Sequence, residues 1–362
     1  MSPVKTCRIA VLPGDGIGPE VVAEALKVLG AAESALGDFH LEFREYSAGA
    51  AEYLRCGDPL PPATLEEIKK YDAILLGAMG LPDVRWPSGV EMVPQIELRE
   101  RLDLYCGVRP IFLYHESHCP LKGLGPGEID FVIIRESTEG LFSARTRMPA
   151  PDAQEAEDRM LITRRGSERL FRAAFDQARR RRGHLALIDK ANVLPSMAYF
   201  RRVFDEVAAE FPDVRTERIY VDAAALYLLQ RPQRFDVLVT ENMFGDILSD
   251  LAAGLVGGMG MAPSADIGDR WAVFQPSHGS APDIAGRGIA NPVATILSAA
   301  MMLEWLGGDA LARAASLMRN AVRAVLSEPL HATADLGGTL ATAEMGGLIA
   351  EKLLELARGK SR

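Results

Sequence analysis

Phe235-Asp236-Val237-Leu238-Val239-Thr240 is an apolar run rich in β-branched residues, and it leads into Glu241-Asn242-Met243-Phe244-Gly245-Asp246-Ile247-Leu248-Ser249-Asp250. The first stretch predicts a buried parallel strand, and the second predicts a helix over residues 243–254. Open α/β sheets bind their ligands just beyond the carboxyl ends of such strands. The two stretches therefore predict an α/β fold with a site at this edge of the sheet.

Asp246 and Asp250 are four residues apart, so on a helix their side chains point the same way, with Cβ atoms roughly 5 to 6 Å apart. Two like charges on one face repel each other. A hard cation such as Mg²⁺ or Mn²⁺ removes that repulsion and prefers oxygen ligands of this kind. The alternative is that these acids only suit the dipole at the start of the helix.

Composition limits the classes of function. The chain has 362 residues, of which 48% are hydrophobic, so two domains or one large α/β unit are expected. A net charge of −9 argues against general binding to nucleic acid or to an anionic membrane. The four cysteines have no CxxC spacing and the start of the chain has no signal-peptide pattern, so we expect a cytoplasmic protein without a membrane role.

The glycine-rich stretch Pro13-Gly14-Asp15-Gly16-Ile17-Gly18-Pro19-Glu20 follows an apolar strand, Cys7 to Leu12, and precedes a helix that is expected to reach about Ala32. A Rossmann dinucleotide site is the alternative here. The third glycine comes one residue early for that fingerprint, and no acid follows at the expected distance. We therefore predict a tight strand-to-helix turn.

Three arginines are candidates for binding an anion. Arg99 and Arg109 belong to Leu98 to Pro110, which predicts a helix leading into a strand, and Arg135 ends the predicted strand that starts at Phe131. An arginine beside a buried strand is costly unless a carboxylate or phosphate pairs with it. The alternative for each is an ordinary surface salt bridge.

Lys190 and Asp222 are also expected at or just past strand ends, after His184 to Asp189 and Ile219 to Val221. A lysine in this position is a candidate base. Two other charged stretches have simpler interpretations. Tyr114 to Cys119 lacks a second ligand pair for zinc, and Arg179-Arg180-Arg181-Arg182 closes a helix begun near Ser167, where basic residues suit the dipole.

Together these stretches resemble the β-decarboxylating dehydrogenases, the family of isocitrate, 3-isopropylmalate, homoisocitrate and tartrate or D-malate dehydrogenases. The matching segments are Gly14 to Glu20, Leu98 to Pro110, Arg135 to Gly140, Asp189 to Val193, Val221 to Asp222, Glu241 to Asp250, and His278 to Asn291. The resemblance implies a non-Rossmann fold with a mixed sheet shared by two domains. It places a large domain at 1–104 and 257–362, and a smaller domain with the dimer contact at 105–256.

The resemblance also implies a homodimer with shared active sites and a chemistry for each residue. Arg99, Arg109 and Arg135 would hold the carboxylates of a malate-like substrate, and Asp222, Asp246 and Asp250 would bind Mg²⁺ or Mn²⁺. Lys190, assisted by Asp222, would take the hydroxyl proton as hydride passes to NAD. The partner subunit would supply both residues. The resulting 3-carboxy ketone would then lose CO₂.

For the cofactor, the resemblance implies NAD rather than NADP, because Asp283 would accept hydrogen bonds from the adenosine ribose and repel a 2′-phosphate. The residues implied on the adenosine side are Met259, Gly260, His278, Gly279, Ala281, Asp283, Ile284 and Asn291.

The chain departs from the family pattern at three places. Phe142 replaces the usual tyrosine and cannot donate a proton. Gln275 stands where the family's adenine-side loop usually has glutamate before proline. Gln95 and Ile96 stand where isopropylmalate enzymes usually show two leucines, which weakens the case for an isopropyl group.

Several functions therefore remain open at this stage. The favoured one is NAD-dependent oxidative decarboxylation of 3-isopropylmalate, D-malate or tartrate. The alternatives are an isocitrate or homoisocitrate substrate, oxidation with poor decarboxylation, and a non-catalytic regulatory paralogue.

Overall fold

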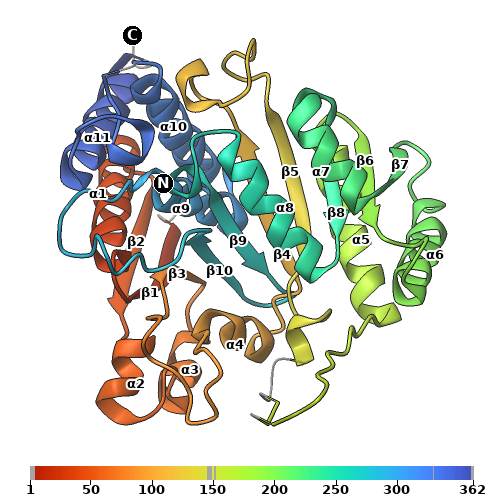
Figure 1. The fold of residues 1–362 in the computed structure, drawn as a ribbon. Helices are drawn as coiled ribbons and strands as arrows, with labels where there is room; N and C mark the ends of the chain where they lie inside the picture. The colour runs from red at the N-terminus through yellow and green to blue at the C-terminus, as the bar shows by residue number, and fades with distance from the viewer. Residues whose placement is uncertain (1–4, 145–148, 151, 329, 360–362) are drawn as a thin grey trace.

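The computed structural model of the protein describes residues 5–144, 149–150, 152–328 and 330–359, which build one mixed sheet with helices on both faces (Figure 1). The order of the strands is β2-β1-β3-β10-β9-β4-β5-β8-β6-β7. β9 runs antiparallel to both of its neighbours, and β4 is antiparallel to β5. The strands are β1 (Lys5–Gly14), β2 (Phe39–Glu45), β3 (Ala73–Ala78), β4 (Cys106–Phe112), β5 (Asp130–Glu136), β6 (His184–Asp189), β7 (Arg215–Tyr220), β8 (Val237–Thr240), β9 (Pro263–Ile267) and β10 (Ala272–Pro276).

The two faces of the sheet carry different helices because side chains alternate along each strand. Ile9 and Val11 pack on one face, called the rear face here, and Ala10 and Leu12 pack on the other, the front face. The rear face is covered by α1 (Gly18–Leu36), α5 (Arg164–Arg179), α6 (Pro195–Ala208), α9 (Val293–Leu306), α10 (Asp309–Leu326) and α11 (Thr342–Gly359). The front face is covered by α3 (Pro62–Ile68), α4 (Pro94–Arg101), α7 (Val221–Gln230) and α8 (Asn242–Gly254).

The glycine-rich stretch is a tight turn, as predicted. A Cβ on Gly14 would lie 1.9 Å from the Ala78 carbonyl oxygen, and a Cβ on Gly16 would lie 1.9 Å from that of Ser280. Both glycines have positive φ, which glycine adopts without strain. Buried Asp15 accepts hydrogen bonds from the backbone N–H groups of Ala50 and Gly80, both at 2.7 Å, and so ties the turn to the start of α2 (Ala50–Cys56).

Some predicted boundaries are wrong. α1 continues past Ala32 to Leu36, where Gly37 ends it in the left-handed conformation. α5 begins at Arg164 rather than near Ser167, because the Thr163 side chain accepts a hydrogen bond from the Gly166 N–H and caps the helix there. Asp222 does not end a strand: β7 stops at Tyr220, and Asp222 lies in the first turn of α7.

Short 3-10 helices occupy η1 (Glu116–His118), η2 (Phe142–Ala144), η3 (Pro232–Arg234), η4 (Met259–Met261) and η5 (Ala334–Leu336). Among the residues that the structure describes, no helix combines the length and the apolar character needed to cross a membrane.

Candidate active site

A cavity of about 280 Å³ opens on the front face between α4 and α8, and it is called the front cavity here. Side chains from β4, β5 and β10 also reach it. Its lining consists of Ala78, Met79, Gln95, Ile96, Arg99, Arg109, Arg135, Phe142, Asp246, Ser249, Asp250, Gln275, Pro276, Ser277, His278 and Gly279. The structure thus brings together residues that are up to about 200 positions apart in the sequence.

The two aspartates of α8 both line the front cavity, as the i,i+4 spacing predicts. The first turn of α8 contains neither of them. Instead Glu241 caps the helix by accepting hydrogen bonds from the N–H groups of Phe244, at 2.6 Å, and Met243, at 3.1 Å. The interpretation of Asp246 and Asp250 as dipole partners is therefore wrong. Burial and the neighbouring Asp246 charge raise the pKa of Asp250, and a bound cation relieves both effects.

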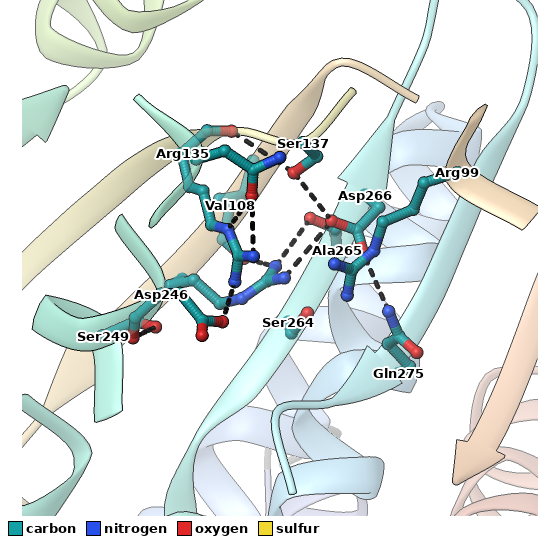
Figure 2. Close-up of polar contacts among 12 residues, drawn as sticks. Arg99, Val108, Arg135, Ser137, Asp246, Ser249, Ser264, Ala265, Asp266 and Gln275 are labelled. Atoms are coloured by element: carbon teal, nitrogen blue, oxygen red, sulfur yellow. Dashed lines mark hydrogen bonds and ion pairs between the residues drawn. The ribbon is translucent and has the colours of Figure 1, made fainter. Parts of the chain in front are cut away.

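All three candidate arginines are buried, so the surface salt-bridge interpretation is wrong for each. Arg99 lies on α4 and Arg109 in the middle of β4, so only Arg135 stands near a strand end. The three arginines form a cluster around the buried carboxylate of Asp266 on β9, and Figure 2 shows Arg99, Arg135 and Asp266 of this cluster. Arg99 Nε donates to Asp266 Oδ2 at 3.0 Å, and Arg109 Nη2 donates to Oδ1 at 3.2 Å.

The charge of Asp266 is stabilised by this cluster. Burial by itself raises the pKa of this carboxyl, but Arg109, Arg99 and Arg135 outweigh burial and lower the pKa to about 2. Burial has the opposite consequence for the cations: it lowers the pKa of Arg135 to about 10. One carboxylate therefore lies among three guanidinium groups, and the cluster retains the capacity to bind a further anion.

Arg135 is oriented by α8. Its Nε and Nη2 donate to the Asn242 side-chain oxygen at 3.0 and 2.8 Å, and its Nη1 donates to Asp246 Oδ1. The Arg135 guanidinium also lies over the ring of Phe142, 5.4 Å from the ring centroid. Phe142 therefore borders the front cavity beside an arginine.

The sequence analysis missed Asp266, Asn242 and the position of Gln275. Gln275 is buried at the end of β10, and its Nε2 donates to Asp266 Oδ2 at 2.6 Å. Gln275 therefore helps to hold the carboxylate of Asp266 in the arginine cluster. Asp266 lies in the strand Pro-Ser-Ala-Asp-Ile, and an acid at the inward position of an apolar strand is the one signal that points to it.

Gln95 and Ile96 line the front cavity at the start of α4. The side-chain oxygen of Gln95 is buried and has no hydrogen-bond partner within the described chain. A buried acceptor without a partner costs free energy, so this oxygen favours a ligand that brings a donor.

Lys190 and Asp222 form a pair of their own. Lys190 Nζ donates to Asp222 Oδ1 at 2.7 Å, and this hydrogen bond lowers the pKa of Asp222. The pair is not among the residues that line the front cavity. Within the described part of one chain, no three His, Cys, Asp or Glu side chains are grouped as a metal site.

The loop after β10 borders the front cavity through His278 and Gly279. Burial lowers the pKa of His278, so this imidazole is neutral near pH 7, and its buried Nε2 has no hydrogen-bond partner among the described residues. Glu20 holds the rest of the loop, accepting hydrogen bonds from the N–H groups of Gly286 and, at 3.1 Å, Gly288. Ala281 has positive φ, Asp283 is exposed, and Ile284 packs on the cluster formed by Ile17 and Val21.

Gly260 and Asn291 lie next to a second acid that the sequence analysis did not single out, Asp335, and Met259 precedes Gly260 in η4. Asn291 Nδ2 donates to Asp335 Oδ2 at 3.1 Å, and a Cβ on Gly260 would meet both side chains. The charge of Asp335 also acts on the His278 imidazole and partly offsets the lowering of its pKa. These residues therefore form one polar neighbourhood beside the loop after β10.

Comparison with known proteins identifies the family. The family model for isocitrate/isopropylmalate dehydrogenase matches residues 8–349. The chain belongs to the isocitrate/isopropylmalate dehydrogenase family. It is therefore an oxidoreductase, and the resemblance seen in the sequence is confirmed.

Relatives in this family agree over nearly the whole chain. A 3-isopropylmalate dehydrogenase of Moorella thermoacetica is 46% identical over 96% of this chain and 99% of its own length. The crystal structure of isocitrate dehydrogenase from Methylococcus capsulatus superimposes with a TM-score of 0.86 at 39% identity, covering 96% of this chain and 99% of that one. A β-decarboxylating dehydrogenase from Thermococcus kodakarensis gives a TM-score of 0.81 at 38% identity, with 98% of each chain covered. The predicted fold class, a mixed α/β sheet of this family, is confirmed.

Proposed function

We propose that this dehydrogenase oxidises and decarboxylates a malate-type 2-hydroxy dicarboxylate, using NAD and Mg²⁺ or Mn²⁺. The observation that carries the proposal is the position of three buried arginines beside the carboxylate pair Asp246 and Asp250. The arginines suit the carboxylates of the substrate, and the aspartates suit a divalent cation. Such a cation would polarise the substrate's hydroxyl and carboxylate oxygens.

In this proposal the enzyme is a homodimer, and Lys190 and Asp222 act in the partner's active site. Their position outside the front cavity of their own chain supports this arrangement. So does an exposed apolar surface on α7 and α8, which includes Leu226, Leu229 and Ile247, 49%, 46% and 58% exposed. Lys190 accepts the hydroxyl proton, and Asp222 orients it and completes the metal ligands. The boundaries at 104/105 and 256/257 are proposed as the limits of the two domains.

The cofactor is proposed to lie along the loop after β10. The buried His278 nitrogen without a partner and the adjacent Gly279 are suited to contact a ligand that continues from the front cavity. Exposed Asp283 suits the two ribose hydroxyls of NAD and repels the 2′-phosphate of NADP. Met259, Gly260, Ala281, Ile284 and Asn291 are proposed to border the same cofactor.

The substrate's C3 substituent is proposed to meet Gln95 and Ile96. The relatives' names cover 3-isopropylmalate and isocitrate, whose C3 groups are apolar and anionic respectively. The unpartnered oxygen of Gln95 favours a group that donates a hydrogen bond, such as the C3 hydroxyl of tartrate, or a small group, as in D-malate.

A substrate panel tests this function directly. We expect turnover with Mn²⁺ and NAD, and an efficiency at least about tenfold lower with NADP, for a 2-hydroxy dicarboxylate among 3-isopropylmalate, D-malate, the tartrates, isocitrate and homoisocitrate. Replacing Gln95 with leucine removes the polar contact and is expected to shift kcat/KM toward 3-isopropylmalate, by about 10-fold to 100-fold relative to tartrate or D-malate.

Gln233→Leu, at an exposed glutamine in η3 outside the front cavity, is the control for Gln95→Leu. Comparable efficiency with NADP contradicts the role given to Asp283. Unchanged substrate preference in Gln95→Leu contradicts the role given to Gln95. Failure of every member of the panel contradicts the proposed activity.

A second candidate function, oxidation with inefficient decarboxylation, is favoured by Phe142, whose ring borders the cavity without a proton to donate. If it applies, wild-type enzyme releases less than one CO₂ per NADH in a single turnover. Phe142→Tyr then supplies a hydroxyl beside Arg135 and is expected to speed CO₂ release by roughly 10²-fold. Phe142→Leu, without a hydroxyl, is the control. A wild-type ratio of one CO₂ per NADH, together with a rate of CO₂ release that Phe142→Tyr leaves unchanged, would exclude this candidate.

A further inference from the structure

A second and larger cavity, of about 630 Å³, opens on the rear face and is called the rear cavity here. It lies between the end of α5 and the helices α9 and α10. Its floor is formed by β4 and β9, the two strands that also carry Arg109 and Asp266 of the arginine cluster. Val108, Ala265 and Ile267 line the rear cavity, whereas the residues between them, Arg109 and Asp266, point to the front face. The two cavities therefore lie on opposite sides of the same strands.

The rim of the rear cavity carries positive charge that the protein does not neutralise. Two acids line it, and each is already paired: Asp130 with Arg181 at 2.7 Å, and Glu304 with Arg319. Arg180 and Arg323 also line it, and neither has an ion-pair partner in the described chain. Arg323 lies over the ring of Phe112, 4.9 Å from the centroid, which fixes its guanidinium at the rim.

Arg180 is the C-cap residue of α5, where the dipole interpretation of the run Arg179 to Arg182 expects a basic residue, but it differs from its neighbours in having no acid partner in the described chain. Arg179 is paired with Asp213 at 2.5 Å, and Arg181 and Arg182 both contact Asp236. Arg180 is the member of the run that is directed to the rear cavity instead of to an acid. Its charge is therefore available to a ligand of the rear cavity.

The interior of the rear cavity includes the hydroxyl of Tyr114 within a largely apolar wall. Tyr114 is 8% exposed, lines the cavity, and its hydroxyl has no hydrogen-bond partner among the described residues. Burial raises the pKa of Tyr114 to about 12, so the hydroxyl keeps its proton and is available as a donor. The surrounding wall includes Trp305, which packs against Phe274, and Met301.

We propose that the rear cavity is a binding site for a small organic monoanion that combines an apolar body with a carboxylate. The volume is within the range of small-molecule sites. Arg180 and Arg323 match the carboxylate, Tyr114 donates to it, and the apolar wall receives the body. The site is separate from the proposed catalytic function and does not depend on it.

Octanoate is a suitable probe, because it has one carboxylate, a flexible apolar body and no ultraviolet absorption that interferes with tryptophan. The chain has three tryptophans, so Trp86→Phe with Trp271→Phe leaves Trp305 in the cavity wall as the only reporter. We expect a saturable change in its fluorescence with a Kd of about 1 mM or lower. Octanamide, which keeps the body and lacks the charge, is expected to bind at least about tenfold more weakly.

Arginine variants of the protein that keeps only Trp305 test whether octanoate binds in the rear cavity. Arg180→Gln with Arg323→Gln is expected to weaken octanoate at least about tenfold. Arg313→Gln removes the same charge from α10 outside the cavity, where Arg313 contacts Asp38, and is expected to leave the Kd unchanged. Tyr114→Phe removes only the hydroxyl and is expected to raise the Kd severalfold.

Arg180 and Arg323 are exposed, so their double variant is expected to melt at the wild-type temperature, which a thermal scan verifies. The proposal is overturned by the absence of a saturable change up to about 10 mM octanoate, by equal binding of octanamide, or by an unchanged Kd in the double variant. Turnover of the wild-type enzyme is a separate readout, so failure at the rear cavity and failure of the proposed activity are distinguishable.

Discussion

Replacing Asp246 with asparagine is expected to lower kcat about 10³-fold or more while the fold and the proposed dimer stay intact. Asparagine keeps an oxygen that accepts from Arg135 but removes the negative charge that a divalent cation requires. The side chain is also about half-exposed, so the change costs little stability. Steady-state kinetics with Mn²⁺, together with Mn²⁺ titration by calorimetry, measure the effect.

Asp176→Asn is a matched control, since Asp176 is an exposed acid on α5 away from the front cavity. We expect it to retain wild-type kcat and Mn²⁺ affinity. Retention of both by Asp246→Asn as well would remove Asp246 from the proposed metal site. Size-exclusion chromatography of the two variants separates loss of metal binding from loss of the proposed dimer.

Replacing Asp266 with asparagine is expected to lower the free energy of unfolding by about 3 to 5 kcal/mol. The variant leaves Arg99 and Arg109 buried without the carboxylate that both contact. Denaturant unfolding near pH 7 measures the loss. Asp213→Asn breaks an exposed aspartate–arginine pair on the surface and is expected to change stability little.

The same pair of proteins tests the charge of Asp266 through pH. Its pKa is about 2 in the folded protein and about 3.9 in an unfolded chain. Because the folded-state pKa is the lower one, this carboxylate stabilises the protein fully above about pH 4, and the stabilisation is lost as pH falls toward 2. The stability difference between wild type and Asp266→Asn is therefore expected to shrink over that window.

Gln275 provides a rescue for this variant. Its side chain contacts Asp266 at 2.6 Å, so Gln275→Glu in the Asp266→Asn background returns one carboxylate to the cluster. We expect the double variant to recover much of the lost stability. Gln275→Glu alone sets two buried carboxylates against each other and is expected to be less stable than wild type. A double variant no more stable than Asp266→Asn would show that the position of the charge, and not its presence, stabilises the cluster.

Local sequence patterns were sufficient for the elements around the site. The strand and helix of residues 235–254 fix Asp246 and Asp250 on one helical face, because side-chain direction follows from the helical repeat alone. The glycine spacing at 14–18 was sufficient to disfavour a Rossmann site. The close approaches at Gly14 and Gly16 explain why glycine stands there, since they leave no room for a side chain. The matched motifs were sufficient for the family.

The tertiary structure decided which charges meet. Arg99 and Asp266 are 167 positions apart, and they touch because β9 enters the sheet antiparallel between β10 and β4. No local pattern encodes that neighbour, so the sequence showed three arginines and left the shared partner of Arg99 and Arg109 unknown. The same strand order places Val108 and Ala265 under the rear cavity. The sequence by itself determined the family and the acids of α8; sheet order, a long-range property, decided that a single buried carboxylate holds two of the arginines beneath the site.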